Sequence, residues 1–427
     1  MAGKATIIAL SSGRLPAALA VVRASGPDAL VLAAALAGPL PPPRHASLRR
    51  LVDPRTGETI DRGLVLAFPG PDSATGENLI EFHLHGGRAV VDALLDAATA
   101  TPGVRLAEAG EFTRRALTNG RIDLVEADGL ADLLAAETEW QRRAAQARAG
   151  GAVSEILEGW RRRLLDLSAM AEVAIDYADE EDGASPTDLV GPIEALAAEV
   201  RVAISAPRIE SLRDGVRVVI AGPTNAGKSS LINALSNSDR AIVTPIAGTT
   251  RDSIEVAMAI DGLPVILVDT AGLRETDDPV EQIGVARART EIDRADLILW
   301  LDREGADDFG EDHRIVNIHA KSDLGPAPPG MLGVSSLSGD GVVELLALVH
   351  RRAEAIVPSP RDLALTRREA ELLGEIVTAL GHAAVNDDPI LAAEELRGAR
   401  LALDRITGRA GVEELLDALF SRFCVGK

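Results

Sequence analysis

The sequence predicts a multidomain fold in which an N-terminal α/β domain precedes a helical domain, and a second α/β domain is inserted into the helical one. The chain has 427 residues, which suggests two or three domains at ~150 residues each. Strand and helix signals alternate up to about residue 117, helical signals dominate to about 207, and alternation returns from 216 to about 356. The chain then becomes helical again, and the two helical pieces can pack together because domain termini are often close in space. The predicted domains are residues 1–117, 118–213, 214–356 and 357–427.

Composition limits the environment of the protein. Hydrophobic residues make up 46% of the chain but aromatic residues only 2%, so the core relies on Ala, Leu, Val and Ile, a bias that favours helices. The single cysteine, Cys424, excludes an internal disulfide and indicates a reducing compartment. Without a signal peptide or a long uncharged segment, we expect a soluble, cytoplasmic protein. The formal net charge of −21 repels polyanions, so any RNA contact needs a local basic patch.

The N-terminal block contains strand-like runs, including VVRASG and LIEFHLHGG, and helical runs such as AVVDALLDAATA. Glycines and prolines separate these runs, which is typical of a small mixed α/β unit. His83 and His85 share one face of a predicted strand and could resemble a metal pair. Without further ligands nearby, a core or turn position is the favoured interpretation.

Apolar residues in the helical blocks recur at spacings of three and four, which predicts amphipathic helices. The proline-containing stretch IVPSPRD at 356–362 separates the second α/β block from the last helical one. The first stripe comprises Val153, Leu157, Trp160, Leu164, Leu167, Ala171 and Ile175, and the C-terminal stripe comprises Val412, Leu415, Leu419 and Phe423.

The stretch GPTNAGKSS at 222–230 fits the phosphate-binding pattern G-x-x-x-x-G-K-S. It follows the predicted strand VRVVIAG and precedes a helix, which is the context that the motif requires. Backbone N–H groups and a helix N-terminus can surround phosphates, while Lys228 can reach the β- and γ-phosphates. The Ser229 hydroxyl can ligate magnesium.

Three further motifs follow in the order of a Ras-like P-loop GTPase domain. AGTTRD at 247–252 offers a threonine hydroxyl to magnesium, and ILVDTAG at 266–272 delivers Asp269 and Gly272 towards the metal and the γ-phosphate. HAKSD at 319–323 and VSSLSG at 334–339 resemble a guanine-recognition pair, in which a carboxylate accepts from the guanine N–H edge and a backbone N–H donates to O6. The predicted nucleotide contacts are Asn225, Ala226, Gly227, Lys228, Ser229, Ser230, Thr244, Pro245, Ile246, Ala247, Gly248, Thr249, Thr250, Asp269, Thr270, Ala271, Gly272, Lys321, Asp323, Ser335, Ser336 and Leu337.

One position departs from the base-recognition pattern, because Ala320 stands where Asn or Thr is usual. The sequence therefore predicts the loss of one guanine contact and of a tether to the phosphate loop. We expect guanine selectivity to persist through Asp323, with weaker nucleotide binding overall.

A second departure concerns catalysis, because Leu273 occupies the place of a water-orienting glutamine. The Asn225 side chain, with loop carbonyls near Thr244, Ile246 and Thr249, could instead hold a monovalent cation against the phosphates. Such a cation would supply the electrostatic stabilisation that an arginine finger gives elsewhere, worth ~10³–10⁵ in rate. Glu281 could orient the water, although by spacing alone it reads more readily as a solvated acidic loop residue.

Several longer stretches resemble the MnmE (TrmE) family of tRNA-modifying GTPases. They are AIVTPIAGTTRD, DTAGLRE with VEQIG, FPGPDSATGEN, AGEFTRRALTNGRIDL and the terminal FCVGK, so the resemblance spans nearly the whole chain. It implies a homodimer formed through the N-terminal domain and fast GTP hydrolysis activated by potassium. Catalytic positions would be Glu281, Lys228 and Asn225; potassium ligands Asn225, Thr244, Ile246 and Thr249; magnesium ligands Ser229 and Thr250.

The resemblance also implies a folate site in the N-terminal domain, for a 5-formyl- or 5,10-methylene-tetrahydrofolate. Matching positions are Arg23, Glu81, Arg121 and Lys427. Arg121 stands where lysine is more usual, which keeps the charge but changes its geometry. Cys424 is either a packed helix-end residue or a thiol near the folate.

The partners implied by the resemblance are tRNA and the flavoprotein MnmG (GidA), with which the dimer forms a heterotetramer or larger complex. Together they would modify C5 of the wobble uridine with an aminomethyl- or carboxymethylaminomethyl-type group. The competing hypothesis is a GTPase switch that checks assembly of a ribosomal particle. Such switches usually carry a basic RNA-binding module, whereas the flanking regions here are acidic to neutral.

Overall fold

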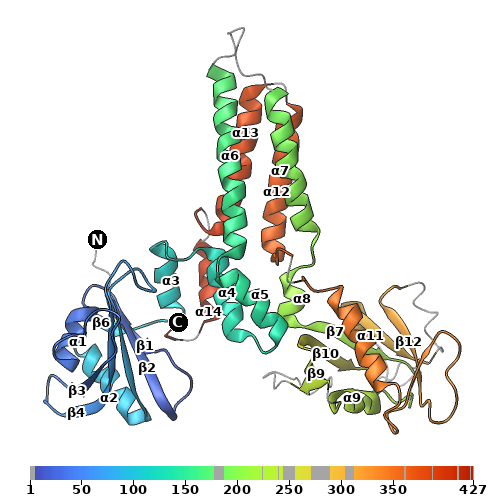
Figure 1. Cartoon of the computed structure of the whole chain (residues 1–427), viewed down its shortest axis with the longest axis horizontal. Coiled ribbons are helices and arrows are strands. Elements are labelled where there is room, and N and C mark those ends of the chain that lie inside the picture. The colour runs from blue at the N-terminus through green and yellow to red at the C-terminus, as the bar shows by residue number, and fades with distance from the viewer. Residues whose placement is uncertain are drawn as a thin grey trace, which may run out of the picture. The chain divides into compact units, whose positions relative to one another are not determined.

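The computed structural model describes residues 5–176, 187–223, 225–238, 240–243, 255–270, 289–302, 312–359, 362–386, 388–410, 413–423 and 425–426. The chain divides into two compact units (Figure 1). The first unit contains residues 1–131 and 404–427, and the second contains residues 132–403. Among the described residues, no helix is long and apolar enough to cross a membrane.

The first unit is built on a six-stranded sheet with the strand order β3-β4-β5-β2-β1-β6. All neighbours are antiparallel except β1 and β6, which are parallel. The elements are β1 (Thr6–Leu10), β2 (Ala17–Ser25), α1 (Ala29–Ala37), β3 (Ser47–Val52), β4 (Thr59–Phe68), β5 (Leu79–Gly86), α2 (Arg88–Thr99) and β6 (Val104–Leu106).

Only one face of this sheet is covered by α1 and α2. Side chains alternate across a strand, and the buried set Val22, Val65 and Phe82 packs with residues of both helices in one hydrophobic cluster. The opposite face of β2, β5, β4 and β3, which we call the open face, carries half-buried and exposed side chains such as Arg23 and Leu64.

Three helices complete the first unit: α3 (Glu111–Thr118), α4 (Leu124–Ala135, whose last turn passes into the second unit) and α14 (Glu413–Ser421). Leu419 and Phe423 of the predicted C-terminal stripe are buried against α4, whereas the Val412 backbone and the Leu415 side chain lie outside what the structure describes. Buried Arg115 in α3 donates to Glu77, Glu111 and the carbonyl of Ala5 at 2.9 Å each. The segments before β1 and before β5 are thereby bonded to α3.

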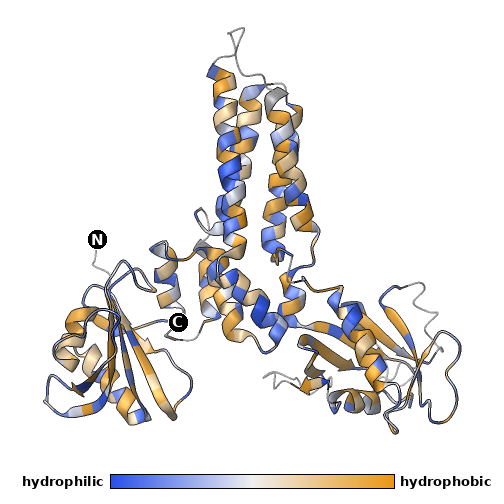
Figure 2. Cartoon of the chain, in the orientation of Figure 1, coloured by the Kyte–Doolittle hydropathy of each residue, from blue (hydrophilic) through white to orange (hydrophobic). Residues whose placement is uncertain are grey.

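In the described part of the second unit, the helices outside the sheet domain are α5 (Glu139–Ala149), α6 (Ala152–Asp176), α7 (Thr187–Ser205), α8 (Ile209–Asp214), α12 (Arg367–Val385) and α13 (Pro389–Thr407, whose last turn belongs to the first unit). Apolar and polar residues alternate along α6 (Figure 2). Six of the seven predicted stripe residues in α6 are buried, but Ile175 is only half-buried and Ala174 takes its place. That member of the stripe was therefore wrong, since a 3.6-residue period after Ala171 falls between the two positions.

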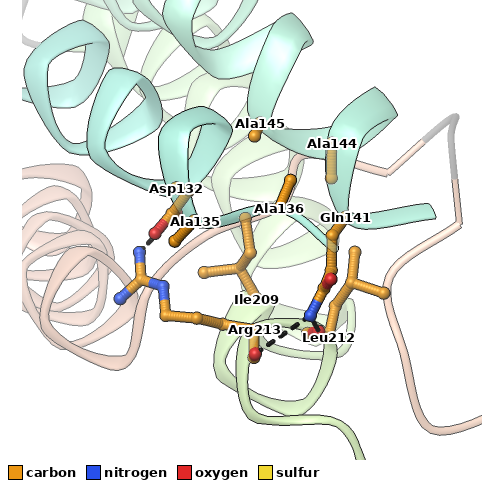
Figure 3. Close-up of a pocket in the computed structure, with 9 residues that line it drawn as sticks. All are labelled: Asp132, Ala135, Ala136, Gln141, Ala144, Ala145, Ile209, Leu212 and Arg213. Carbon is orange, nitrogen blue, oxygen red and sulfur yellow. Dashed lines mark hydrogen bonds and ion pairs between the residues drawn. The ribbon is translucent and has the colours of Figure 1, made fainter. Parts of the chain in front are cut away.

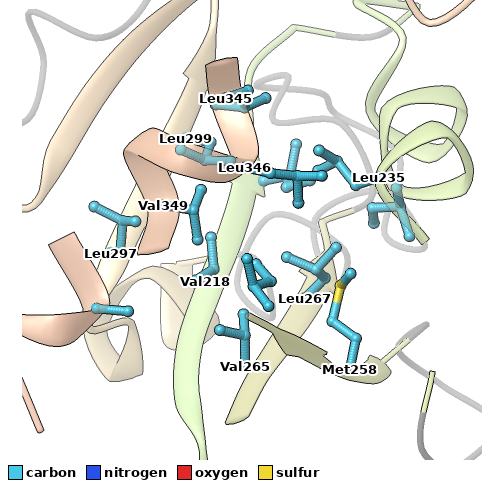
Figure 4. Close-up of a cluster of buried hydrophobic side chains, with 14 of the residues drawn as sticks. Val218, Leu235, Met258, Val265, Leu267, Leu297, Leu299, Leu345, Leu346 and Val349 are labelled. Atoms are coloured by element: carbon cyan, nitrogen blue, oxygen red, sulfur yellow. The ribbon is translucent and has the colours of Figure 1, made fainter. Parts of the chain in front are cut away.

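The sheet domain of the second unit has seven strands in the order β13-β12-β11-β7-β10-β9-β8. Its elements are β7 (Val216–Ala221), α9 (Lys228–Ser236), β8 (Ala241–Val243), β9 (Glu255–Ile260), β10 (Leu263–Asp269), β11 (Leu297–Leu301), β12 (Ile315–Ala320), β13 (Leu332–Val334) and α11 (Val342–Glu354). Aliphatic side chains of its strands, α9 and α11 form one core (Figure 4). Helices of the helical domain precede this sheet domain in the sequence and follow it again, so the sheet domain is inserted into the helical one. The predicted fold class is therefore confirmed.

The two connections between the helical part and the sheet domain lie together. The Ile209 N–H donates to the carbonyl of Leu365 at 3.0 Å, and the Arg367 N–H donates to the Glu210 carboxylate at 2.8 Å. Beside them, fully buried Arg148 donates to both oxygens of Glu369, at 3.0 and 2.8 Å.

A small hollow of about 40 Å³ lies where α4, α5 and α8 meet in the second unit (Figure 3). Arg213 forms an ion pair with Asp132 at 2.6 Å beside it, and the Gln141 amide donates to the carbonyls of Leu212 and Arg213 at 3.2 Å each. These bonds attach the helix that leads into β7 to the N-terminus of α5.

Candidate nucleotide site

The phosphate loop joins the C-terminal end of β7 to the first residue of α9. Its glycines have conformations that other residues rarely adopt. Gly222 has φ +138°, and a Cβ there would lie 2.6 Å from the carbonyl oxygen of Leu301. Gly227 has φ +99° and Asn225 has φ +63°. This turn leads directly into the N-terminus of α9, where an anion is stabilised.

The Lys228 ammonium lies over this loop and is largely buried. It donates to the carbonyl of Gly222 at 3.0 Å and to that of Pro223 at 2.8 Å. Burial lowers the pKa of Lys228, and the nearby Asp269 carboxylate offsets part of that shift. The ammonium is therefore positioned where phosphate oxygens can take over its bonds.

Ser229 and Asp269 meet beside the loop. The Ser229 hydroxyl donates to the Asp269 carboxylate at 2.5 Å. Asp269 ends β10, which is parallel to β7, so both strands deliver their C-terminal residues to one edge of the sheet. Oxygen ligands are those that Mg²⁺ prefers, so the Ser229 hydroxyl fits its predicted role as a magnesium ligand, and Asp269 beside it fits the predicted second metal shell. Thr270 faces the other way and donates to the carbonyl of Ile220 at 2.8 Å.

A pocket of about 330 Å³ opens next to the phosphate loop. It is lined from the loop and α9 by Ala226, Gly227 and Ser230, and from the base-recognition segments by Ala320, Lys321, Asp323, Leu324, Ser336 and Leu337. The volume and the mixed apolar and polar lining suit a purine nucleoside. The structure thus brings the phosphate loop and the base-recognition loop, whose residues Asn225 and Lys321 are 96 apart in the chain, to one cavity.

Asp323 is held in this pocket by a fully buried serine. The Ser335 hydroxyl donates to Asp323 at 2.6 Å and accepts the N–H groups of Leu337 and Ser338 at 3.3 and 3.2 Å. Ser335 therefore fixes the carboxylate and the following turn together. Sequence spacing placed it near the base but did not reveal this bond.

A tether between the base loop and the phosphate loop is present. The Lys321 ammonium donates to the carbonyl of Asn225 at 2.7 Å. The tether that Asn or Thr would make from position 320 is missing at Ala320, as expected, and this bond from the neighbouring Lys321 is a separate link that was not predicted. Ala320 itself lines the pocket and contributes no polar side-chain group.

Several predicted site residues lie outside the part of the chain that the structure describes. They are Thr244, Pro245, Ile246, Ala247, Gly248, Thr249, Thr250, Ala271, Gly272, Glu281 and, in the folate set, Lys427, as well as Leu273 and Cys424. Of the four predicted potassium ligands, the structure describes Asn225, whose side chain is exposed at the rim of the phosphate loop.

In the first unit, Arg23 and Glu81 meet on the open face. They are directly opposite in the β2–β5 register and form an ion pair at 2.6 Å, while His83 lies 3.2 Å from the other Glu81 oxygen. Burial alone would raise the pKa of Glu81, but the hydrogen bonds from Arg23 and His83 lower it overall. Arg121 lies 3.7 Å from Asp72, in the loop before β5.

The favoured core or turn position was wrong for both histidines, because they lie within β5 and their side chains are 30% and 73% exposed. His83 reaches Glu81, and His85 reaches Asp61 across the strands at 2.8 Å. Among the described residues, no group of three or more His, Cys, Asp or Glu side chains is arranged to hold a metal ion.

The fold and the nucleotide site together define a P-loop GTPase whose nucleotide domain is inserted into a helical domain. Residues 6–121 match the family model described as GTP-binding protein TrmE N-terminus, and residues 124–424 match the MnmE helical domain. The chain belongs to the MnmE family.

Close relatives cover the full length of the chain. The tRNA modification GTPase MnmE of Erythrobacter litoralis is 50% identical over 433 residues, covering 99% of this chain and 100% of that protein. The protein of the same name from Rhizorhabdus wittichii is 52% identical over 429 residues, covering 99% of this chain and 96% of that protein. The one from Novosphingobium aromaticivorans is 48% identical over 436 residues, covering 99% of both chains.

Proposed function

We propose that this protein is a potassium-activated GTPase that, with a flavin-dependent partner, modifies C5 of the wobble uridine of certain tRNAs. The observation that carries the proposal is the full-length similarity to relatives named tRNA modification GTPase MnmE. The GTPase activity in this proposal is supported by the pocket that lies between the phosphate loop and Asp323, whose carboxylate is held by buried Ser335. GTP hydrolysis would drive a conformational change, and a folate bound near Glu81 would donate one carbon.

In this mechanism the chain binds and orients GTP. Asp323, held by Ser335, accepts from the guanine N–H edge. Lys228 exchanges its two carbonyl bonds for bonds to the β- and γ-phosphates, which costs little because the ammonium is already desolvated and pointed at the loop. Ser229 would offer a hydroxyl ligand to magnesium, with Asp269 beside it in the second shell of the metal, and the bound ion would neutralise phosphate charge.

The rate of hydrolysis would depend on charge placed beside the leaving phosphate. The Asn225 side chain extends from a loop position with φ +63° whose carbonyl is fixed by Lys321. Its amide oxygen, together with main-chain oxygens of 244–249, would bind an alkali cation. The cation would stabilise the negative charge that develops in the transition state and so raise the rate of hydrolysis by ~10³-fold or more. Glu281 would orient the attacking water, in place of the glutamine replaced by Leu273.

The test compares GTP turnover in potassium and in sodium salts at equal ionic strength. We expect potassium to be many-fold faster for the wild type, and Asn225→Ala to abolish the difference. Asn225→Gly is the better probe, since glycine keeps the positive φ while removing the amide. Asn233→Ala, an exposed asparagine of α9, serves as the matched control. Equal rates in both salts for the wild type would refute potassium activation.

A second assay tests the division of labour with the partner. The isolated protein is expected to hydrolyse GTP but to leave wobble uridine unmodified until a flavoprotein partner and a one-carbon folate are added. Nucleoside analysis of the tRNA by mass spectrometry measures this directly. Modification by the isolated protein would contradict the proposal.

A further inference from the structure

The open face of the first unit carries three rows of side chains that the strand register places side by side. The first row is the ion-paired Arg23 and Glu81. Two residues further along the strands, Leu64 lies opposite both Leu48 and His83. Strands rise about 3.3 Å per residue, so each row lies about 6.6 Å from the next.

The third row is a pair of arginines, since Arg50 of β3 lies directly opposite Arg62 of β4. Both are exposed, and within the described residues neither guanidinium has a hydrogen bond or ion pair. Like charges directly opposite destabilise a sheet. The neighbouring carboxylate, Asp61, is already engaged by the backbone N–H and ring of His85 at 2.9 and 2.8 Å. Among the residues that the structure describes, this pair therefore has no bonded counter-charge.

The row between the two polar ends is apolar and open to solvent. Leu48 is 55% exposed and Leu64 is 40% exposed, and they lie opposite each other on the same face. Along the open face, the Glu81 carboxylate is therefore followed by the two leucines and then by the guanidinium groups of the arginine pair. The distance from the first row to the third is four residues of strand, or about 13 Å.

We propose that this track binds a folate with a polyglutamate tail and that the arginine pair makes the site selective for polyglutamylated forms. Glu81 and Arg23 take the heterocyclic head, Leu48 and Leu64 the aromatic spacer, and Arg50 and Arg62 the carboxylates of the added glutamates. Guanidinium groups pair with carboxylates in bidentate fashion, which favours arginine here. The inference rests on the proposed folate site and adds its specificity.

The test is isothermal titration of the full-length protein with 5-formyltetrahydrofolate that carries one or three glutamates. The wild type is expected to bind the triglutamate form about tenfold more tightly, as one added charge-assisted contact would give. Arg50→Gln combined with Arg62→Gln should lose this preference, so that both forms bind with similar affinity. Arg49→Gln is the matched control, because Arg49 lies in the same strand but donates to the carbonyl of Pro39.

The possible results distinguish a failure of the polyglutamate-tail site from a failure of the folate site as a whole. Equal binding of both forms by the wild type overturns the tail site and leaves the folate site intact. Failure of the monoglutamate to bind overturns both. Loss of dimerisation in the double variant, measured by sedimentation, would assign the arginine pair to an interface between copies of this chain and overturn the tail site. A preference that the double variant loses, and that weakens with added salt, supports it.

Discussion

The buried ion pair between Arg148 and Glu369 allows a quantitative prediction about how the two pieces of the helical domain are joined. The Arg148 side chain is 0% exposed and that of Glu369 is 5% exposed. Besides its two bonds to Glu369, the guanidinium donates to the carbonyl of Ala364 at 2.5 Å. The substitution Arg148→Met would keep much of the side-chain volume and remove every one of these bonds.

The expected loss of unfolding free energy follows from the Glu369 carboxylate, which Arg148→Met leaves without its partner. The Glu369 carboxylate would stay buried, with the backbone N–H of Thr366 at 2.8 Å still bound to it. Breaking a buried pair in this way costs about 3–5 kcal/mol of unfolding free energy. Removing both charges, as Arg148→Met with Glu369→Leu, should restore most of the loss, because no unpaired charge is left. The exposed pair of Arg143 and Glu139 is the control, for which Arg143→Met should leave the unfolding transition nearly unchanged.

The assay is urea unfolding followed by tryptophan fluorescence. All three tryptophans, Trp140, Trp160 and Trp300, belong to the second unit, so the signal reports on that unit alone. If Arg148→Met shifted the transition no more than Arg143→Met did, the pair would not stabilise the junction. If the double variant were as unstable as the single one, packing rather than the unpaired charge would account for the loss.

Three further predictions concern pH, the phosphate loop and base selectivity. Burial alone would raise the pKa of Glu111, but hydrogen bonds, first from Arg105, lower it to about 2. The contribution of ionised Glu111 to the unfolding free energy is therefore present above pH ~4.3 and is lost as the pH falls towards 2. Glu111→Gln should make the stability less dependent on pH in this range, as measured by circular-dichroism unfolding. Gly222→Ala, which places a Cβ 2.6 Å from the Leu301 carbonyl, should abolish binding of a fluorescent GTP analogue, and near-wild-type affinity would contradict the loop geometry. Asp323→Asn should weaken GTP but not xanthosine triphosphate in competition binding, and an unchanged preference would remove Asp323 from base recognition.

Part of the nucleotide site could be predicted because its geometry is local. The spacing of Gly222, Gly227 and Lys228 specifies a turn between a strand and a helix, and the structure has that turn. The bond from Lys321 to the Asn225 carbonyl was not predicted, because a long, flexible lysine side chain can reach several carbonyl groups. Only the path of the backbone determines which carbonyl lies within its reach. The bond from Ser335 to Asp323 could have been suspected from the order of the two motifs, although nothing in the spacing gives its direction.

The sequence by itself determined the elements and the turn chemistry of this protein. Apolar periodicity specified its helices and strands, and glycines specified the phosphate loop, because these depend on neighbours within one or two turns of chain. Tertiary structure decided which charges meet. Arg148 and Glu369 are 221 residues apart, and Arg23 and Glu81 are 58 apart. Such partners are chosen by strand register and helix packing, which place side chains together according to shape and burial rather than distance along the chain.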